Sequence, residues 1–93
     1  MKISFTEDFL FDLNEQVNYI ARDKPQTARK FKNDLIKKLK KDICNPFLFK
    51  KSRYFDSEYI RDYIFKGYIS VYEVDIEKNI VSVFAYIKYR DSL

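Results

Sequence analysis

The hydrophobic pattern of the sequence changes its period at Asn45-Pro46, and this change constrains the fold more than any other feature. Before it, apolar residues recur three or four positions apart in two stretches, as they do along one face of an α-helix. After it, β-branched and aromatic residues alternate with polar ones, which is typical of strands. Helices that precede strands, rather than alternate with them, predict an α+β protein. The helical stripes are Leu10, Leu13, Val17 and Ile20, then Ala28, Phe31, Leu35, Leu39 and Ile43.

Local signals place the ends of the first three elements. Residues 2–5 alternate between polar and apolar and predict a short strand. Thr6 is a capping hydroxyl followed by two acidic residues, so a first helix is expected near residues 7–22. Pro25 is tolerated in the first turn of a second helix. That helix ends at Asn45-Pro46, because proline disfavours the helical conformation in the residue before it.

The second half is expected to form a loop and three strands. Residues 47–57 show no clear period, and Lys66-Gly67 offers a turn whose glycine can adopt a positive φ. The resulting order is β-α-α-β-β-β, with the helical hairpin packed on one face of a small antiparallel sheet. The length of 93 residues is that of one domain, spanning 1–93. The three expected strands are Tyr59–Phe65, Tyr68–Val74 and Ile80–Tyr89.

Alternation within the strands predicts which face the helices cover. We assign the purely aliphatic sets to the helix-covered face, which places Ile60 and Ile64 there together with one side of the last strand. The opposite face would then be open and rich in tyrosine, with Arg61, Lys88 and Arg90 near the strand ends. The aliphatic set of the last strand is Val81, Val83, Ala85 and Ile87.

Several kinds of chemistry are excluded by what the sequence lacks. It contains no histidine, which removes the most frequent general base and the usual activation of a serine or cysteine nucleophile. Cys44 is the only cysteine, so neither an internal disulfide nor a cysteine-based metal site is expected. We expect no metal and no cofactor. No apolar run is long enough to cross a membrane, and the start lacks a signal peptide, so a cytoplasmic location is expected.

Positive charge is concentrated in the middle of the chain. The net charge is +4, but residues 29–53 carry ten basic and two acidic side chains, a local balance of +8. The remaining 68 residues have 8 basic and 12 acidic side chains, or −4. Such a field attracts nucleic acid or an acidic protein segment, although a solvated helix face explains it equally well. Of the functional readings, we favour attraction of an acidic protein or long-range steering, because no base-reading motif accompanies the stripe.

Five short stretches follow one another along the chain: Tyr19–Pro25, Asn45-Pro46, Tyr59–Tyr68, Val71–Asp75 and Lys88–Arg90. As an ordered set, they resemble the RelE/ParE superfamily of bacterial toxins. The resemblance spans nearly the whole chain and is nearer to ParE than to RelE. It implies a growth-inhibiting toxin of a type II toxin–antitoxin module, silenced by a cognate antitoxin protein. Operator DNA would be bound only through the antitoxin complex, and no membrane is involved.

The resemblance implies two alternative targets. RelE-like members cut messenger RNA on the ribosome with basic residues of the central strands, whereas ParE-like members poison DNA gyrase. Where RelE-like enzymes have basic residues around the Gly-Tyr turn, this chain has Ile60, Asp62, Ile64 and Ile69. This departure favours the action on gyrase, leaves catalysis uncertain, and keeps open a degenerate member that only binds antitoxin.

Two groups of residues are candidates for the functional site. If the chain is a ribonuclease, the catalytic set would be Arg61, Lys88, Arg90 and Tyr86, with Tyr89 or Tyr86 in the role that a C-terminal tyrosine has in RelE-like members. The competing interpretation pairs Arg61 with a carboxylate such as Glu73 across the sheet. The second group would contact the target or the antitoxin, since arginine and tyrosine are enriched at protein interfaces. Its members are Lys50, Lys51, Arg53, Tyr63, Lys66 and Tyr89.

Overall fold

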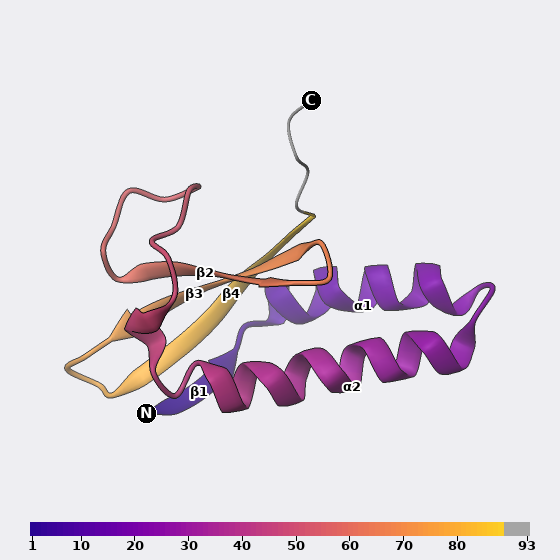
Figure 1. Ribbon diagram of the computed structural model, residues 1–93, viewed down its shortest axis with the longest axis horizontal. Helices are drawn as coiled ribbons and strands as arrows, with labels where there is room; N and C mark the ends of the chain where they lie inside the picture. Colours follow the sequence, from indigo (N-terminus) through magenta and orange to yellow (C-terminus); the bar gives the residue numbers. More distant parts are fainter. Residues whose placement is uncertain (89–93) are drawn as a thin grey trace.

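The computed structural model describes residues 1–88, in which one helical hairpin and one four-stranded sheet form two layers (Figure 1). The expected order β-α-α-β-β-β is confirmed, with one turn of 3-10 helix, η1, added after the hairpin. The elements are β1 Lys2–Phe5, α1 Glu7–Ala21, α2 Pro25–Asp42, η1 Pro46–Leu48, β2 Ile60–Phe65, β3 Tyr68–Asp75 and β4 Ile80–Lys88.

The sheet has the strand order β1-β4-β3-β2 and is mixed. As expected, β2, β3 and β4 form an antiparallel meander. The first strand differs from expectation, because β1 pairs in parallel with β4 over the register from Lys2↔Ile80 to Phe5↔Val83. The hairpin of α1 and α2 forms part of the long connection that brings the chain back to the sheet, and β4 then runs in the direction of β1. The sheet is therefore antiparallel only in three of its four strands.

The helical hairpin forms for the reasons that the sequence suggests. The side chain of Thr6 accepts a hydrogen bond from the backbone N–H of Phe9 at 3.2 Å, and Glu7 and Asp8 occupy the positive end of α1. Pro25 stands at the start of α2. Both helices turn their apolar stripes toward the sheet, and Figure 1 shows them side by side along it. Their buried residues are Phe9, Leu13, Ala28, Phe31, Leu35 and Leu39. No helix within residues 1–88 has the length and apolarity required to cross a membrane.

Aromatic residues of β2, not its isoleucines, face the helices, so the assignment of Ile60 and Ile64 to the covered face is wrong. Tyr63 and Phe65 are only 5% and 8% exposed, whereas Ile64 is 57% exposed. The ring of Phe65 contacts that of Phe31 in α2, with centroids 5.8 Å apart. Large rings fill the space between the two layers, and the hydroxyl that β2 contributes there is satisfied, because Tyr63 donates to Asp42.

A β-bulge in β4 reverses the alternation that the sequence suggests. Val71 pairs with Ala85 and Tyr72 pairs with Val83, so Phe84 has no partner in β3. Val81 and Val83 lie in the helix-covered core, as expected. Beyond the bulge, Tyr86 packs against that core, and its neighbours Ala85 and Ile87 point to the other face. The predicted aliphatic face of the last strand is therefore correct for its first half and wrong for its second.

The turn at Lys66-Gly67 confirms the predicted hairpin. Both residues have positive φ angles, 49° and 84°, and they join the paired residues Phe65 and Tyr68. Two central residues with positive φ characterise the two-residue turn whose twist matches the twist of the flanking strands.

The segment after α2 is a loop, as expected, but it runs beside β2. The backbone N–H of Ser52 donates to the carbonyl of Ile60 at 2.8 Å, and that of Asp62 donates to the carbonyl of Lys50 at 3.1 Å. Lys51 and Arg61 form an isolated bridge between the loop and β2. Basic residues of the loop are thereby held next to the edge strand.

Candidate functional site

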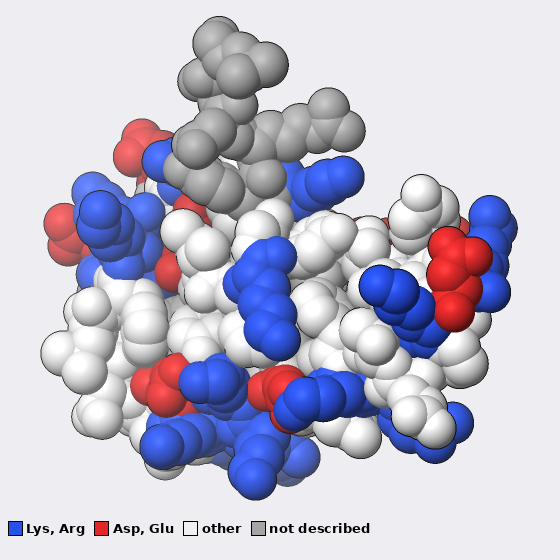
Figure 2. All heavy atoms as spheres, turned by 45° about the vertical axis from the view of Figure 1, so that its right-hand side comes forward, with Lys and Arg blue, Asp and Glu red and all other residues white. Residues whose placement is uncertain are grey.

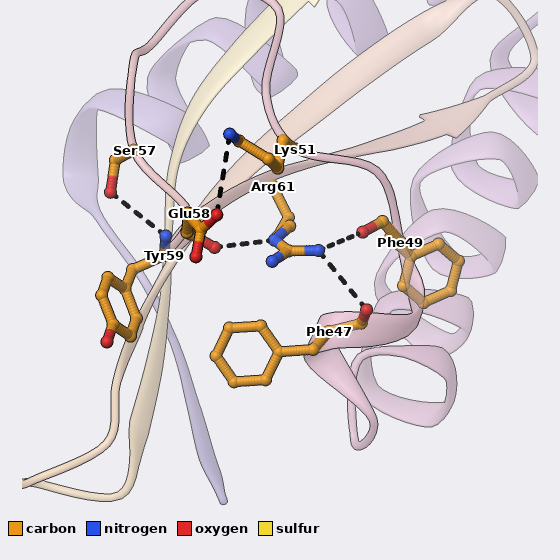
Figure 3. A network of polar contacts seen from close by, with 7 residues as sticks. All are labelled: Phe47, Phe49, Lys51, Ser57, Glu58, Tyr59 and Arg61. Atoms are coloured by element: carbon orange, nitrogen blue, oxygen red, sulfur yellow. Dashed lines mark hydrogen bonds and ion pairs between the residues drawn. The ribbon is translucent and has the colours of Figure 1, made fainter.

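Arg61 fastens the loop to β2 through backbone carbonyls. Its Nε donates to the carbonyl of Glu58 at 2.8 Å, and its Nη1 donates to those of Phe49 at 2.8 Å and Phe47 at 3.4 Å (Figure 3). The guanidinium also lies over the ring of Phe47, 5.0 Å from its centroid. These contacts hold both ends of the segment that precedes β2. The alternative pairing with Glu73 is not formed, since the carbonyl oxygens of the loop take its place.

Tyr86 lies beneath the helices, so its expected position on an open sheet face is wrong. Its ring stacks on that of Tyr68 at 5.4 Å and meets the edge of Phe9 at 5.9 Å. The hydroxyl is buried and has no hydrogen-bond partner among the described residues. Burial, and next the neighbouring Tyr68, raise the pKa of Tyr86 well above its usual value. A phenol of this kind stays protonated and is a poor general base.

Lys88 is exposed at the opposite end of the sheet from Arg61. Lys88 pairs with Tyr68, whereas Arg61 pairs with Tyr72, so four residues of β3, about 13 Å along the strand, separate their positions. Arg61, Lys88 and Tyr86 therefore do not converge on one site. Arg90 lies outside the described residues, as does Tyr89.

The surroundings of Lys88 are acidic and aromatic. Lys88 borders a hollow of about 340 Å³ between α1 and the sheet, where its one positive charge faces the carboxylates of Asp12 and Glu15. Local charge of this sign opposes the binding of a phosphate group. The hollow is completed by Gln16, Tyr19, Tyr68 and Tyr86.

The basic residues of the loop do come together. Lys50, Lys51 and Arg53 border a hollow of about 450 Å³ next to Asp62 and the exposed side chain of Ile64. The carboxylate of Asp62 accepts a hydrogen bond from the backbone N–H of Arg53 at 3.0 Å, which shapes this side of the loop. A 3.9 Å ion pair joins Lys51 to Glu58, and both side chains are largely exposed. We call the cationic residues Lys50, Lys51 and Arg53 the loop cluster.

The other two candidates for binding that the structure describes differ in accessibility. Tyr63 is buried, and burial followed by its hydrogen bond to Asp42 raises its pKa above the usual value. It is a core residue and not a contact residue, which corrects the expectation from sequence. Lys66 is exposed in the turn, with its ammonium 5.4 Å from the centroid of the Phe65 ring. Within residues 1–88, no group of three or more histidine, cysteine or acidic side chains is placed to hold a metal ion.

The comparison with known families identifies the chain. Residues 3–90 match the family described as the ParE toxin of the type II toxin–antitoxin system parDE. The chain belongs to the ParE toxin family. This confirms the resemblance to the RelE/ParE superfamily and its position nearer to ParE. No curated protein sequence matches the chain.

Solved structures of low sequence identity share the fold of this ParE family member. A chain of the chromosomal ParDE toxin–antitoxin system from P. aeruginosa is 14% identical and superposes with a TM-score of 0.74. That match covers 97% of both chains. The isolated RelE toxin of E. coli is 22% identical with a TM-score of 0.54, and 98% of this chain matches 86% of that one.

Two surface features of this ParE family member lie outside the two groups of candidate site residues that the sequence suggested. Phe11 and Tyr19 of α1 are each 66% exposed, on a helix that has no lysine or arginine. The sequence already places both residues outside the apolar stripe of that helix, and this signal would have identified them as exposed aromatic residues. Lys37, Lys38 and Lys41 of α2 border a hollow of about 310 Å³. The helical spacing of these lysines signals a cationic face, but the hollow depends on side-chain positions that the sequence does not reveal.

Proposed function

We propose that this chain is the growth-arresting toxin of its module and acts on DNA gyrase, as a binding toxin and not as a ribonuclease. The observation that carries this proposal is the hydrogen bonding of Arg61 to three backbone carbonyls. A guanidinium engaged in this way holds a loop, and it is not presented to a reacting phosphate. The proposal agrees with the ParE family and with the ParDE structure of the same fold.

The alternative, cleavage of messenger RNA, needs groups that the described surface does not bring together. Cleavage requires a base for the 2′-hydroxyl, positive charge at the phosphorane and an acid for the leaving oxygen. The sequence has no histidine, and the pKa of Tyr86 is raised by burial. Lys88 is set apart from Arg61 and faces carboxylates. A toxin that binds and distorts its target needs none of these groups.

We place the contact with a macromolecule at the loop cluster, together with Lys66 and the C-terminal Tyr89. The loop cluster borders the largest of the hollows described above and is adjacent to Ile64, an exposed apolar side chain on an edge strand. Arginine is enriched at protein interfaces, and the two lysines beside Arg53 add positive charge that attracts an acidic partner. The proposed partners are a cognate antitoxin, which silences the toxin in the cytoplasm, and gyrase as the target.

Induced expression of the toxin with and without a co-expressed antitoxin gene tests the toxin role. We expect growth arrest with the toxin alone and growth when both proteins are present. Growth that continues with the toxin alone, while purified toxin still binds the antitoxin, would identify a degenerate member that retains only antitoxin binding.

Two assays, one with purified toxin and one with RNA from cells that express it, separate the targets. We expect inhibition of DNA supercoiling by gyrase and no new 5′ ends in cellular messages by primer extension. The Lys88→Ala variant serves as the discriminating control, because Lys88 is exposed and its loss leaves the core intact. It should inhibit gyrase as the wild type does. New message ends that disappear in Lys88→Ala would establish the ribonuclease instead.

A further inference from the structure

The two helices of the hairpin carry opposite charge. Helix α1 contains four acidic residues and no lysine or arginine. Within α2, seven basic residues stand against Asp34 and Asp42, a balance of 7 − 2 = +5. Figure 2 shows blue side chains gathered along the lower edge of the molecule, where Figure 1 places α2. The basic residues are Arg29, Lys30, Lys32, Lys37, Lys38, Lys40 and Lys41.

Most of these cations are exposed and lie on the side of α2 that faces away from the sheet. Six of the seven are exposed, while Lys32 is half-buried and donates to Asn14 of α1 at 2.7 Å. The apolar stripe of α2 points into the core, so the residues between its members point outward. Twelve residues separate Arg29 from Lys41, which extends the cationic face over about 18 Å at 1.5 Å per residue.

Acidic side chains leave this face largely uncompensated. Lys30 is the one cation of α2 that forms an ion pair within residues 1–88, with Asp34 at 3.1 Å. The other acid of the helix, Asp42, accepts the hydroxyl of Tyr63. Lys37, Lys38 and Lys41 border the hollow of about 310 Å³ together with these same two acids, and none of the three lysines forms an ion pair within residues 1–88. The face therefore presents concentrated positive charge to a partner.

The chemistry of the face distinguishes nucleic acid from protein. No large hydrophobic side chain of α2 is exposed, whereas α1 exposes Phe11 and the loop exposes Phe47 and Leu48. Protein interfaces are enriched in aromatic anchors and depleted of lysine. Phosphodiester backbones, in contrast, are bound electrostatically by lysine and arginine through release of counterions, and this binding needs no apolar anchor. We propose that the outward face of α2 binds the phosphodiester backbone of nucleic acid without reading its sequence.

Binding of this type holds a nucleic acid in place and does not recognise its base sequence. Lysine is a flexible point charge. Apart from Arg29, the face lacks the planar guanidinium groups that recognise a base edge through two parallel hydrogen bonds. Backbone binding of this type has a dissociation constant on the order of 10⁻⁴ to 10⁻⁶ M at physiological salt. It does not depend on the target proposed above, because both DNA and RNA offer the same phosphates. The experiment therefore measures binding to DNA and to RNA separately.

The salt dependence of binding tests the proposal. Full-length toxin is titrated with fluorescent 20-base-pair DNA and RNA duplexes of two unrelated sequences at 50 to 200 mM salt. Five phosphate contacts give a slope of log K against log salt of roughly −4.5, or roughly 500-fold weakening over this range. The Lys37→Gln, Lys41→Gln double variant should lose two contacts, which reduces the weakening to roughly 40-fold. A higher affinity for one of the two duplexes shows whether the face prefers DNA or RNA.

A second double variant controls for net charge. Lys2→Gln, Lys78→Gln removes the same charge from β1 and from the β3–β4 turn, outside α2, and should keep a slope near that of the wild type. Circular dichroism confirms that both variants fold, and a polyglutamate peptide serves as competitor. Equal slopes in the two double variants, strong dependence on base sequence, or displacement by polyglutamate at equal charge concentration would each overturn the proposal.

Discussion

The hydroxyl of Tyr72 donates a hydrogen bond to the carbonyl oxygen of Pro46, and so joins the middle of β3 to the start of η1. Tyr72 is completely buried, and the bond spans 26 positions of the sequence. Arg61 binds the neighbouring carbonyls of Phe47 and Phe49. Three carbonyl groups within residues 46–49 are thus held by two side chains of adjacent strands, and this anchorage fixes where the loop cluster begins.

Replacing Tyr72 by phenylalanine should destabilise the fold. The carbonyl of Pro46 would remain buried without this donor, at a cost of about 1–3 kcal/mol in the free energy of unfolding. Urea denaturation measures the loss. Tyr19→Phe is the matched control, because the Tyr19 side chain is largely exposed and its hydroxyl can be solvated. An equal effect of both substitutions would contradict a structural role for the bond.

Alkaline pH should destabilise the protein through its buried tyrosines. Burial is the largest cause that raises the pKa of Tyr63, Tyr72 and Tyr86 in the folded state. The folded protein therefore retains phenolic protons that the unfolded chain releases above pH about 10. Stability is full below that pH and falls as the pH rises, by up to about 1.4 kcal/mol per unit for each tyrosine.

Urea midpoints at pH 8, 10 and 11 check this dependence. Tyr86→Phe should reduce the loss of stability above pH 10, whereas the exposed Tyr59→Phe should leave it unchanged. A stability that is independent of pH between 8 and 11 would refute the assignment of these phenols to the core.

Removal of the Arg61 side chain should loosen the loop before it affects the rest of the molecule. Arg61→Ala abolishes three hydrogen bonds to carbonyls, and Arg61→Lys should not restore them, because an ammonium lacks the fork of donors. We expect a loss of about 1–2 kcal/mol. Limited trypsin digestion should cut faster at Lys50 and Lys51.

The control for Arg61 is Lys51→Ala, which removes an exposed ion pair worth at most about 1 kcal/mol. It should leave cleavage at Lys50 unchanged. If Arg61→Ala abolished messenger RNA cleavage while its loop stayed protected from trypsin, then Arg61 would be catalytic and not a clamp.

Substitution of Gly67 should carry a purely conformational cost. Its φ of +84° is one that side chains rarely adopt, and a Cβ built there meets no atom within 4 Å. Gly67→Ala is therefore expected to cost about 1 kcal/mol, and Gly67→Asn less, because asparagine tolerates positive φ. Thermal unfolding measures both. Equal melting temperatures for alanine and wild type would show that the turn adopts another conformation.

The helices and the first hairpin were predictable because their signals are local. Thr6 caps the helix that its position suggests, and Pro25 and Pro46 mark the start and the end of the second helical stretch. Gly67 lies in the turn for which its freedom is needed. In each case, neighbouring residues in the sequence determine the structure.

The faces of the sheet were not predictable in the same way. Both faces of β2 contain large apolar residues, so alternation alone does not tell whether Ile64 or Phe65 meets the helices. The bulge at Phe84 is a property of the pairing with β3, and no residue of β4 signals it. The parallel partner of β1 also depends on a contact nearly 80 positions away.

The errors in the predicted faces of the sheet also affected the prediction of the candidate site. Arg61 and Tyr86 were expected on an open face. Arg61 is on the same face of β2 as the buried Tyr63 and contacts η1 and the loop, and the bulge in β4 turns Tyr86 toward α1. Tyr63 itself belongs to the core. The loop cluster did emerge from sequence, because adjacent basic residues in a loop remain close whatever the register of the sheet.

The opposite charges of α1 and α2 make the hairpin an electric dipole directed across the two helix axes. In the field of a long polyanion such a dipole experiences a torque, which rotates the molecule during approach, before any atoms touch. It would arrive with α2 leading and α1 trailing. The exposed rings of Phe11 and Tyr19 would then point away from the polyanion, toward solution, where another protein can reach them.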